Sequence, residues 1–230
     1  MRQGIRALGA LTVLVPVTLA AQTRPFEGAI TIRMNPAASA ASAGAPGAAP
    51  MPPQTFEYLV RGGRLRMNLT GGPGGGMSVI ASPQEKKLYM LVPSQGAYME
   101  MPLAAAAGSS EAAMTAAKGT KVERTGRMET VAGYRCEHLL VTPARGPATD
   151  LCVTTELGRY IDPLQGMRPA AAPAWQQALA DGFPLKVMLP NGAVVMEVTA
   201  VERKRLDHVL FAVPASYIKM AAPAMRPPSR

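Results

Sequence analysis

The stretch PLKVMLPNGAVVMEVTAVE, residues 184–202, decides the fold class, because two alternating apolar segments flank a tight-turn signal. Asn191-Gly192 is typical of a two-residue hairpin turn, since both residues accept the left-handed backbone that this turn requires. Pairing across the turn gives three matched pairs: Lys186 with Glu197, Val187 with Met196 and Leu189 with Val194. Opposite charges and apolar partners fall into register together, which favours an antiparallel hairpin.

The same alternation recurs along the chain. FEGAITIRM, residues 26–34, places its apolar residues on one face of a strand and its polar residues on the other. Further segments of this kind are separated by Gly, Pro and Ser turns: GGRLRMNL (62–69), MSVIAS (77–82), KKLYMLVP (86–93) and AYMEMPL (97–103). Only SSEAAMTAAK (109–118) and PAWQQALADG (173–182) favour short helices. The pattern predicts a mainly β (α+β) fold with antiparallel strands.

The beginning of the chain, MRQGIRALGALTVLVPVTLAAQ, has the architecture of a secretory signal peptide. A basic start precedes a short apolar run at residues 7–19, and Thr18-Leu19-Ala20 fits signal peptidase. The run is shorter than the roughly 20 residues that cross a bilayer. No cysteine follows it, which argues against a lipid anchor on a thiol. We expect residues 1–20 to be removed and the mature chain to be soluble and periplasmic or secreted.

The rest of the sequence indicates one domain at residues 21–220. A hydrophobic fraction of 48% is ample for a core. The Ala/Pro-rich stretch 35–53 and the glycine run 71–76 bury little apolar surface per ordered residue, so we expect a disordered insertion and a loose loop. Residues 221–230 are expected to form a flexible tail.

Two cysteines, Cys136 and Cys152, are present in a chain that we expect to be exported. Such a pair most often forms a disulfide in an oxidising compartment. Folding YRCEHLLVT (134–142) back on TDLCVTTE (149–156) with the cysteines opposite one another also places His138 opposite Asp150. The alternative is a copper or zinc site formed by Cys136, His138 and Cys152. We expect the disulfide and no metal, because no fourth ligand is evident nearby.

Motifs of catalysis are absent from the sequence. It contains no GxSxG, HExxH, CxxC or phosphate-binding glycine motif, and it has only two histidines. We therefore expect no enzyme activity, no catalytic residues and no cofactor. Among the fifteen methionines, Met90, Met99 and Met101 alternate with Leu and Tyr, which favours core packing or an adaptable apolar surface over copper ligation.

The formal net charge of +9 narrows the class of partner. Nucleic acid is the usual partner of a basic chain, but export argues against it. An anionic membrane surface or an acidic partner fits better, although most basic residues are expected to be solvated faces of strands.

The order of these segments resembles an exported bacterial domain of unknown function related to the outer-membrane lipoprotein carrier (LolA-like) superfamily. The resemblance covers about residues 26–220. Its most specific parts are Gly133-Tyr134-x-Cys136, which leads into a strand, and the closing Leu210-Phe211-x-Val213-Pro214-x-x-Tyr217. It implies a curved antiparallel sheet, an unclosed half-barrel, with a few short helices over its concave face.

In that superfamily the space between sheet and helices can hold acyl chains. The resemblance and the one-sided apolar strands together predict a non-catalytic binding protein for a lipid, a lipoprotein acyl chain or a hydrophobic peptide. One alternative is an envelope structural or interaction module without a ligand, and a weaker one is a periplasmic protein that binds copper or zinc. A roomy apolar cavity under the sheet favours the first class, and an interior filled by the protein's own side chains favours the second. The patterns indicate neither the ligand nor the oligomeric state.

Overall fold

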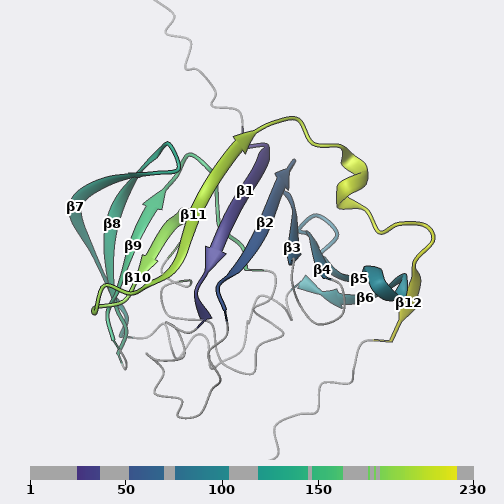
Figure 1. Ribbon diagram of the computed structural model, residues 1–230, viewed down its shortest axis with the longest axis horizontal. Helices are drawn as coiled ribbons and strands as arrows, with labels where there is room; N and C mark the ends of the chain where they lie inside the picture. Colours follow the sequence, from purple (N-terminus) through teal and green to yellow (C-terminus); the bar gives the residue numbers. More distant parts are fainter. Residues whose placement is uncertain are drawn as a thin grey trace, which may run out of the picture.

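Twelve strands form a single curved, unclosed sheet in the computed structural model, which describes residues 25–36, 52–69, 76–103, 119–144, 147–162, 176, 179 and 182–221 (Figure 1). The strands are β1 (Gly28–Met34), β2 (Gln54–Arg61), β3 (Arg64–Leu69), β4 (Met77–Ser82), β5 (Lys87–Val92), β6 (Ala97–Pro102), β7 (Lys121–Val131), β8 (Tyr134–Thr142), β9 (Thr149–Thr154), β10 (Phe183–Met188), β11 (Val194–Arg203) and β12 (Ile218–Met220). Two short 3₁₀ helices, η1 (Pro93–Gln95) and η3 (His208–Phe211), accompany them. The predicted fold class is confirmed.

Two antiparallel meanders make up the sheet, whose strand order is β12-β6-β5-β4-β3-β2-β1-β11-β10-β9-β8-β7. Strands β1 to β6 form the first meander and β7 to β11 the second. The long pairing of β1 with β11 joins them, so the N-terminal strand lies in the middle of the sheet. Only β12 pairs in parallel, along the edge of β6. Among the described residues, the outer edge of β7 has no partner strand.

The predicted hairpin at Asn191-Gly192 forms, and two of its three pairs are confirmed. Lys186 lies opposite Glu197 and Val187 opposite Met196. The third prediction was wrong, because a bulge makes Met188 the partner of Val194. Pro190 has no N–H to close a two-residue turn, and the Leu189 N–H donates to the Ala193 carbonyl at 2.9 Å instead.

The main core lies on one face of the sheet, which we call the inner face and define by Ile30, Tyr58 and Leu185. Side chains of alternating residues from β5 round to β8 form most of one buried cluster there, which extends to Val131 and to Cys136 and Cys152. Met101 packs against this cluster, and Met90 lies opposite Met99 on β6. Met101 therefore packs on the core as expected, while Met90 and Met99 are half-buried on the same face.

The opposite, outer face is covered in its centre by residues 204–217, which we call the C-terminal strap. The strap runs from β11 to β12 and carries η3 (Figure 1). Its Leu206 and Phe211 are buried against Ala29 and Leu59. Arg66 donates to the Leu210 carbonyl at 2.9 Å, and burial under the strap lowers the pKa of Arg66. The short helix that the structure describes here thus covers the outer face.

Several predicted segments lie outside the described residues. These are the signal peptide at 1–20, the helix at 109–118 and nearly all of the insertion at 35–53, the helix at 173–182 and the tail at 221–230. In the part of the chain that is described, no helix has the length and apolar character needed to cross a membrane.

Candidate functional site: a polar cluster over the disulfide

Cys136 of β8 and Cys152 of β9 are joined by a disulfide, with their Cα atoms 5.2 Å apart. The bond is the expected one, but the predicted register was wrong by two residues. His138 lies opposite Cys152, and Leu140 lies opposite Asp150. The reason lies in the apolar packing of the inner face. The observed register sets Leu139 opposite the fully buried Leu151, whereas the predicted register would have placed a glutamate there.

The disulfide lies in a row of outer-face residues that crosses five strands. Successive partners in this row are His138 of β8, Cys152 of β9, Lys186 of β10, Glu197 of β11 and Arg33 of β1. At the far end of the row, Arg33 forms an ion pair with Glu197 at 2.7 Å. The Lys186 side chain turns the other way, towards β7.

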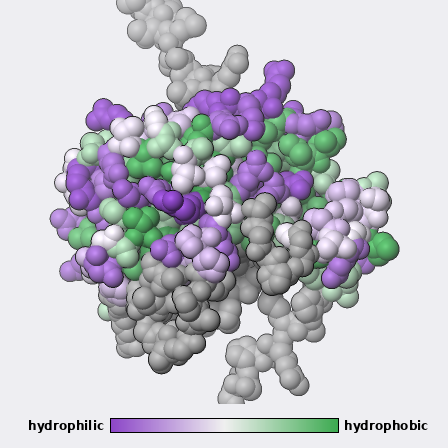
Figure 2. All heavy atoms as spheres, viewed as in Figure 1, coloured by the Kyte–Doolittle hydropathy of each residue, from purple (hydrophilic) through white to green (hydrophobic). Residues whose placement is uncertain are grey.

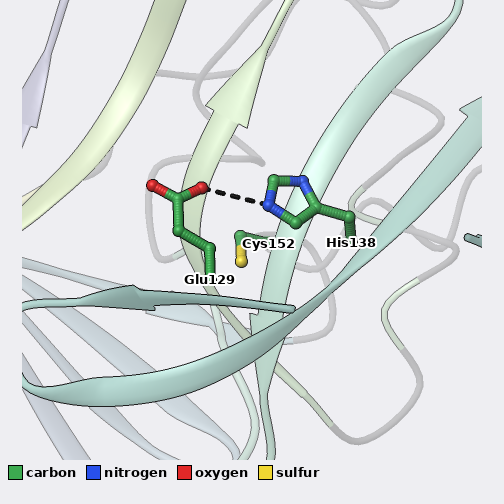
Figure 3. Close-up of side chains that lie close together, drawn as sticks. All are labelled: Glu129, His138 and Cys152. Atoms are coloured by element: carbon green, nitrogen blue, oxygen red, sulfur yellow. Dashed lines mark hydrogen bonds and ion pairs between the residues drawn. The ribbon is translucent and has the colours of Figure 1, made fainter. Parts of the chain in front are cut away.

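His138 is the centre of the polar cluster, and its side chain is only 2% exposed. Its Nε2 lies 3.0 Å from a carboxylate oxygen of Glu129, as Figure 3 shows. Its Nδ1 lies 2.7 Å from Asp150. The His138–Asp150 contact expected from the sequence is therefore present, on a diagonal between the strands.

Two cations complete the cluster. Lys186 Nζ lies 2.9 Å from the second carboxylate oxygen of Glu129. Arg127 forms an ion pair with Asp150 and also lies 2.6 Å from His138 Nδ1. We call Arg127, Glu129, His138, Asp150 and Lys186 together the polar cluster. Strands β8 and β9, which the disulfide joins, lie between β7 and β10. The Glu129 side chain of β7 therefore extends over the disulfide to reach Lys186 of β10.

A bulge in β7 positions Arg127 of this cluster. The register with β8 shifts between Arg124 and Met128, and Gly126 has the positive φ of 70° that favours glycine. The Thr125 hydroxyl donates to the His138 carbonyl at 2.8 Å and fixes the bulged backbone. The bulge turns Arg127 towards Asp150, since bulges re-aim side chains at strand edges.

Metal binding is the most specific function that the geometry of this cluster suggests. Ligand atoms of Glu129, His138 and Cys152 lie within 4.8 Å of one another. However, the Cys152 sulfur is bonded to Cys136, and metal ions bind the thiolate. Both oxygens of Glu129 already have partners in His138 and Lys186. The structure thus brings the predicted trio together: Cys136 and Cys152 form a disulfide, and His138 lies over it in contact with two carboxylates.

The sequence pattern missed Arg127, Glu129 and Lys186 as members of the cluster. Lys186 was assigned to Glu197 because the two are cross-strand neighbours, and that pairing is present in the backbone register. The contact of Lys186 with Glu129 reaches across β8 and β9 from a position opposite Cys136. Gly126 was the one local signal of the bulge, since isolated glycines in strands often mark such sites.

The cluster makes the protein sensitive to acid. The hydrogen bond from Lys186 lowers the pKa of Glu129, against the opposing effect of burial. A depressed carboxyl pKa stabilises the fold above the unfolded-state value and loses that effect as the pH falls through the folded-state pKa. Hydrogen bonds from two lysines likewise lower the pKa of Glu100 to about 2. The contribution of these two carboxylates to the free energy of unfolding is therefore lost as the pH falls below about 4.5.

We expect Lys186→Met to reduce the loss of stability between about pH 6 and pH 3, because the pKa of Glu129 then returns towards its unfolded value. Urea denaturation at a series of pH values measures the effect. Lys121→Met is the matched control, since the exposed Lys121 makes no ion pair in the described structure. An unchanged pH dependence in Lys186→Met would show that Glu129 gains nothing from the lysine.

Comparison with known proteins assigns the chain to a family. The family described as "Domain of unknown function (DUF4412)" matches residues 48–217, which include every strand from β2 to β11. This chain belongs to the DUF4412 family. The expected membership in a family of unknown function is confirmed, and the curved unclosed sheet is the architecture that the LolA-like resemblance implied. Among curated proteins, none matches the DUF4412 chain in sequence.

The solved structures that resemble this chain share little sequence identity with it. The crystal structure of MucB has a TM-score of 0.41 and 16% identity, covering 86% of this chain and 60% of that one. The MucA/MucB complex from Pseudomonas aeruginosa has a TM-score of 0.40 and 16% identity, covering 83% and 56%. PNGF-II has a TM-score of 0.44 and 12% identity, covering 86% and 32%. The DUF4412 chain thus spans less than two thirds of each, and no function is carried over from them.

Proposed function

We propose that this DUF4412 chain is an exported, non-catalytic interaction module whose interior is filled by its own side chains. The burial of the inner face carries the proposal. Ile30, Val79 and Leu88 are completely buried, as are Phe183 and Leu185. These residues lie on four strands of the sheet, and the chain itself covers them. Sites for small ligands are usually largely preformed and concave, so a covered inner face favours the interaction module.

Part of the cover is the described segment 155–162 after β9, which Tyr58 holds through Ile161. The Tyr58 hydroxyl donates to the Ile161 carbonyl at 3.2 Å and accepts from the Ile161 N–H at 3.1 Å. The rings of Tyr160 and Phe183 pack on Tyr58, with centroids 5.9 and 5.4 Å away. Burial raises the pKa of Tyr58 and keeps the hydroxyl neutral. Tyr160 and Ile161 are thus fixed over the inner face by both packing and hydrogen bonds.

The proposed partner contact is the edge strand β7. This edge strand is exposed along most of its eleven residues, and Val122 and Met128 are 47% and 48% exposed. Large apolar side chains on a sheet edge favour contact with another chain. The bulge between them and the charged Lys121 and Arg124 oppose open-ended pairing of copies. This combination suits one specific partner better than self-aggregation.

Site-specific photo-crosslinking tests the proposed surface. A photoreactive residue at Val122 or at Met128 should give one discrete adduct in cells that export the protein. The same residue at Asn191, exposed in the hairpin turn, is the matched control and should give none. Absence of an adduct from both β7 positions, or an equal adduct from the control, would remove β7 as the contact surface.

The second candidate is the predicted binding of an apolar or amphipathic ligand such as an acyl chain. It is favoured by the half-buried methionines Met90, Met99 and Met101 at the β5–β6 side of the inner face, because methionine surfaces adapt to varied apolar ligands. A ligand there would have to displace cover from the inner face. Titration with a fluorescent fatty acid distinguishes the two candidates. If the cover opens to admit a ligand, Tyr58→Phe should bind the fatty acid more tightly than the native chain. If the interior stays filled, neither protein should show saturable binding.

A further inference from the structure

Basic side chains gather at one end of the sheet. We call Lys86, Arg135, Arg159, Arg203, Lys204 and Arg205 the basic rim, and all six are exposed. They belong to four separate places in the chain: the β4–β5 turn, the start of β8, the segment after β9 and the end of β11.

Antiparallel pairing brings these places to the same end. Gly28 at the start of β1 lies opposite Arg203 at the end of β11 and opposite Val60 near the end of β2. The alternation of strand direction continues to the β4–β5 turn on one side and to the start of β8 on the other. Figure 2 shows hydrophilic side chains along the upper margin, where β11 ends in Figure 1.

The six rim cations outnumber the four exposed carboxylates on the same segments, Glu85, Glu156, Glu202 and Asp207. Lys204 forms an ion pair with Glu202 at 2.8 Å, and Arg203 packs over the rings of Phe26 and Tyr134. In the described structure the other four members, Lys86, Arg135, Arg159 and Arg205, make no salt bridge. At the opposite end of the sheet, the described turns 93–96 and 189–193 contain no charged residue. The described part of the molecule therefore has one basic end.

We propose that the basic rim docks on a membrane surface through anionic lipid headgroups. The free cations lie on several different turns across the width of the sheet, and they do not converge on one point. A small anion would meet few of them, whereas a planar layer of negative headgroups meets many at once. Each lysine or arginine near such a surface strengthens binding by about fivefold. This inference goes beyond the interaction module and does not depend on it, because it concerns the end of the sheet and not the β7 edge.

Co-sedimentation with vesicles tests the rim. The oxidised chain should bind vesicles containing phosphatidylglycerol far more than vesicles of phosphatidylcholine alone, and added salt should weaken the binding. The double variant Arg159→Gln/Arg205→Gln should bind phosphatidylglycerol vesicles about 25-fold more weakly, from two contributions of about fivefold each.

The matched control is Arg33→Gln/Lys121→Gln, which removes the same charge at positions away from the rim. It should retain most of the binding, and circular dichroism should show that both double variants are folded. Equal binding to both kinds of vesicle overturns the proposal. An equal loss in the control also overturns it, because net charge and not the rim then sets the affinity. If a double variant does not fold, the single substitutions Arg205→Gln and Lys121→Gln make the same comparison.

Discussion

Cys136→Ser and Cys152→Ser should each lower the free energy of unfolding by about 2–5 kcal/mol, as loss of a native disulfide does in small exported domains. The two cysteines are separated by 16 positions in the chain, and closing a loop of about 15 residues accounts for roughly 3 kcal/mol through the entropy of the unfolded chain. Both sulfur atoms belong to fully buried residues, so the two variants should lose similar amounts. Equilibrium urea denaturation under non-reducing conditions measures the loss.

The double variant should be little less stable than either single variant, because each substitution already breaks the same bond and the effects of coupled residues do not add. His138→Ala is a useful comparison, since Arg127 and Lys186 remain as partners for the two carboxylates. We expect it to cost less than either cysteine substitution. Additive losses in the double variant would contradict a shared disulfide.

Gly28→Ala should be among the most damaging single substitutions in the sheet. A Cβ atom at this position would lie 2.0 Å from the carbonyl oxygen of Glu202, so the backbone of β11 would have to move. Overpacking of this kind costs up to about 3 kcal/mol or more. The midpoint of thermal unfolding should fall by roughly 6–12 °C, at the 2–4 °C per kcal/mol typical of this size.

Gly62→Ala is the control for Gly28→Ala. Gly62 has a positive φ of 56°, but a Cβ atom there would meet nothing within 4 Å. Its substitution should cost only the roughly 1–2 kcal/mol of a left-handed backbone. If the two variants melt at the same temperature, the close pairing of β1 with β11 is not as tight as described.

The fold was largely predictable because its signals are local. Alternation of apolar and polar residues identifies a strand within six or eight positions, and Asn191-Gly192 fixes a turn between two of them. The pairs Lys186–Glu197 and Val187–Met196 follow from those two facts alone. The order of the strands in the sheet has no such local signal. Nothing in 28–34 or 194–203 marks β1 and β11 as the partners that join the two meanders.

The polar cluster was only partly predictable. Two cysteines in a chain that we expect to be exported indicate a disulfide, but placing Cys136 opposite Cys152 suggested a register two residues away from the real one. The real register pairs the half-buried Leu139 with the fully buried Leu151, and His138 still reaches Asp150 on a diagonal. Glu129 was missed although it lies in regular register opposite Cys136. Strand periodicity carries no information on how far a long side chain reaches across neighbouring strands.

Native mass spectrometry of protein purified from the envelope of an exporting bacterial host is the most direct test of a filled, exported interaction module. We expect one species without lipid or metal, beginning at about Ala21 or Gln22 as signal peptidase specificity requires. Its mass should be lower than that of the reduced polypeptide by two hydrogen atoms, because Cys136 and Cys152 are joined. A species that carries one lipid per chain would contradict the filled interior and establish the ligand-binding class instead.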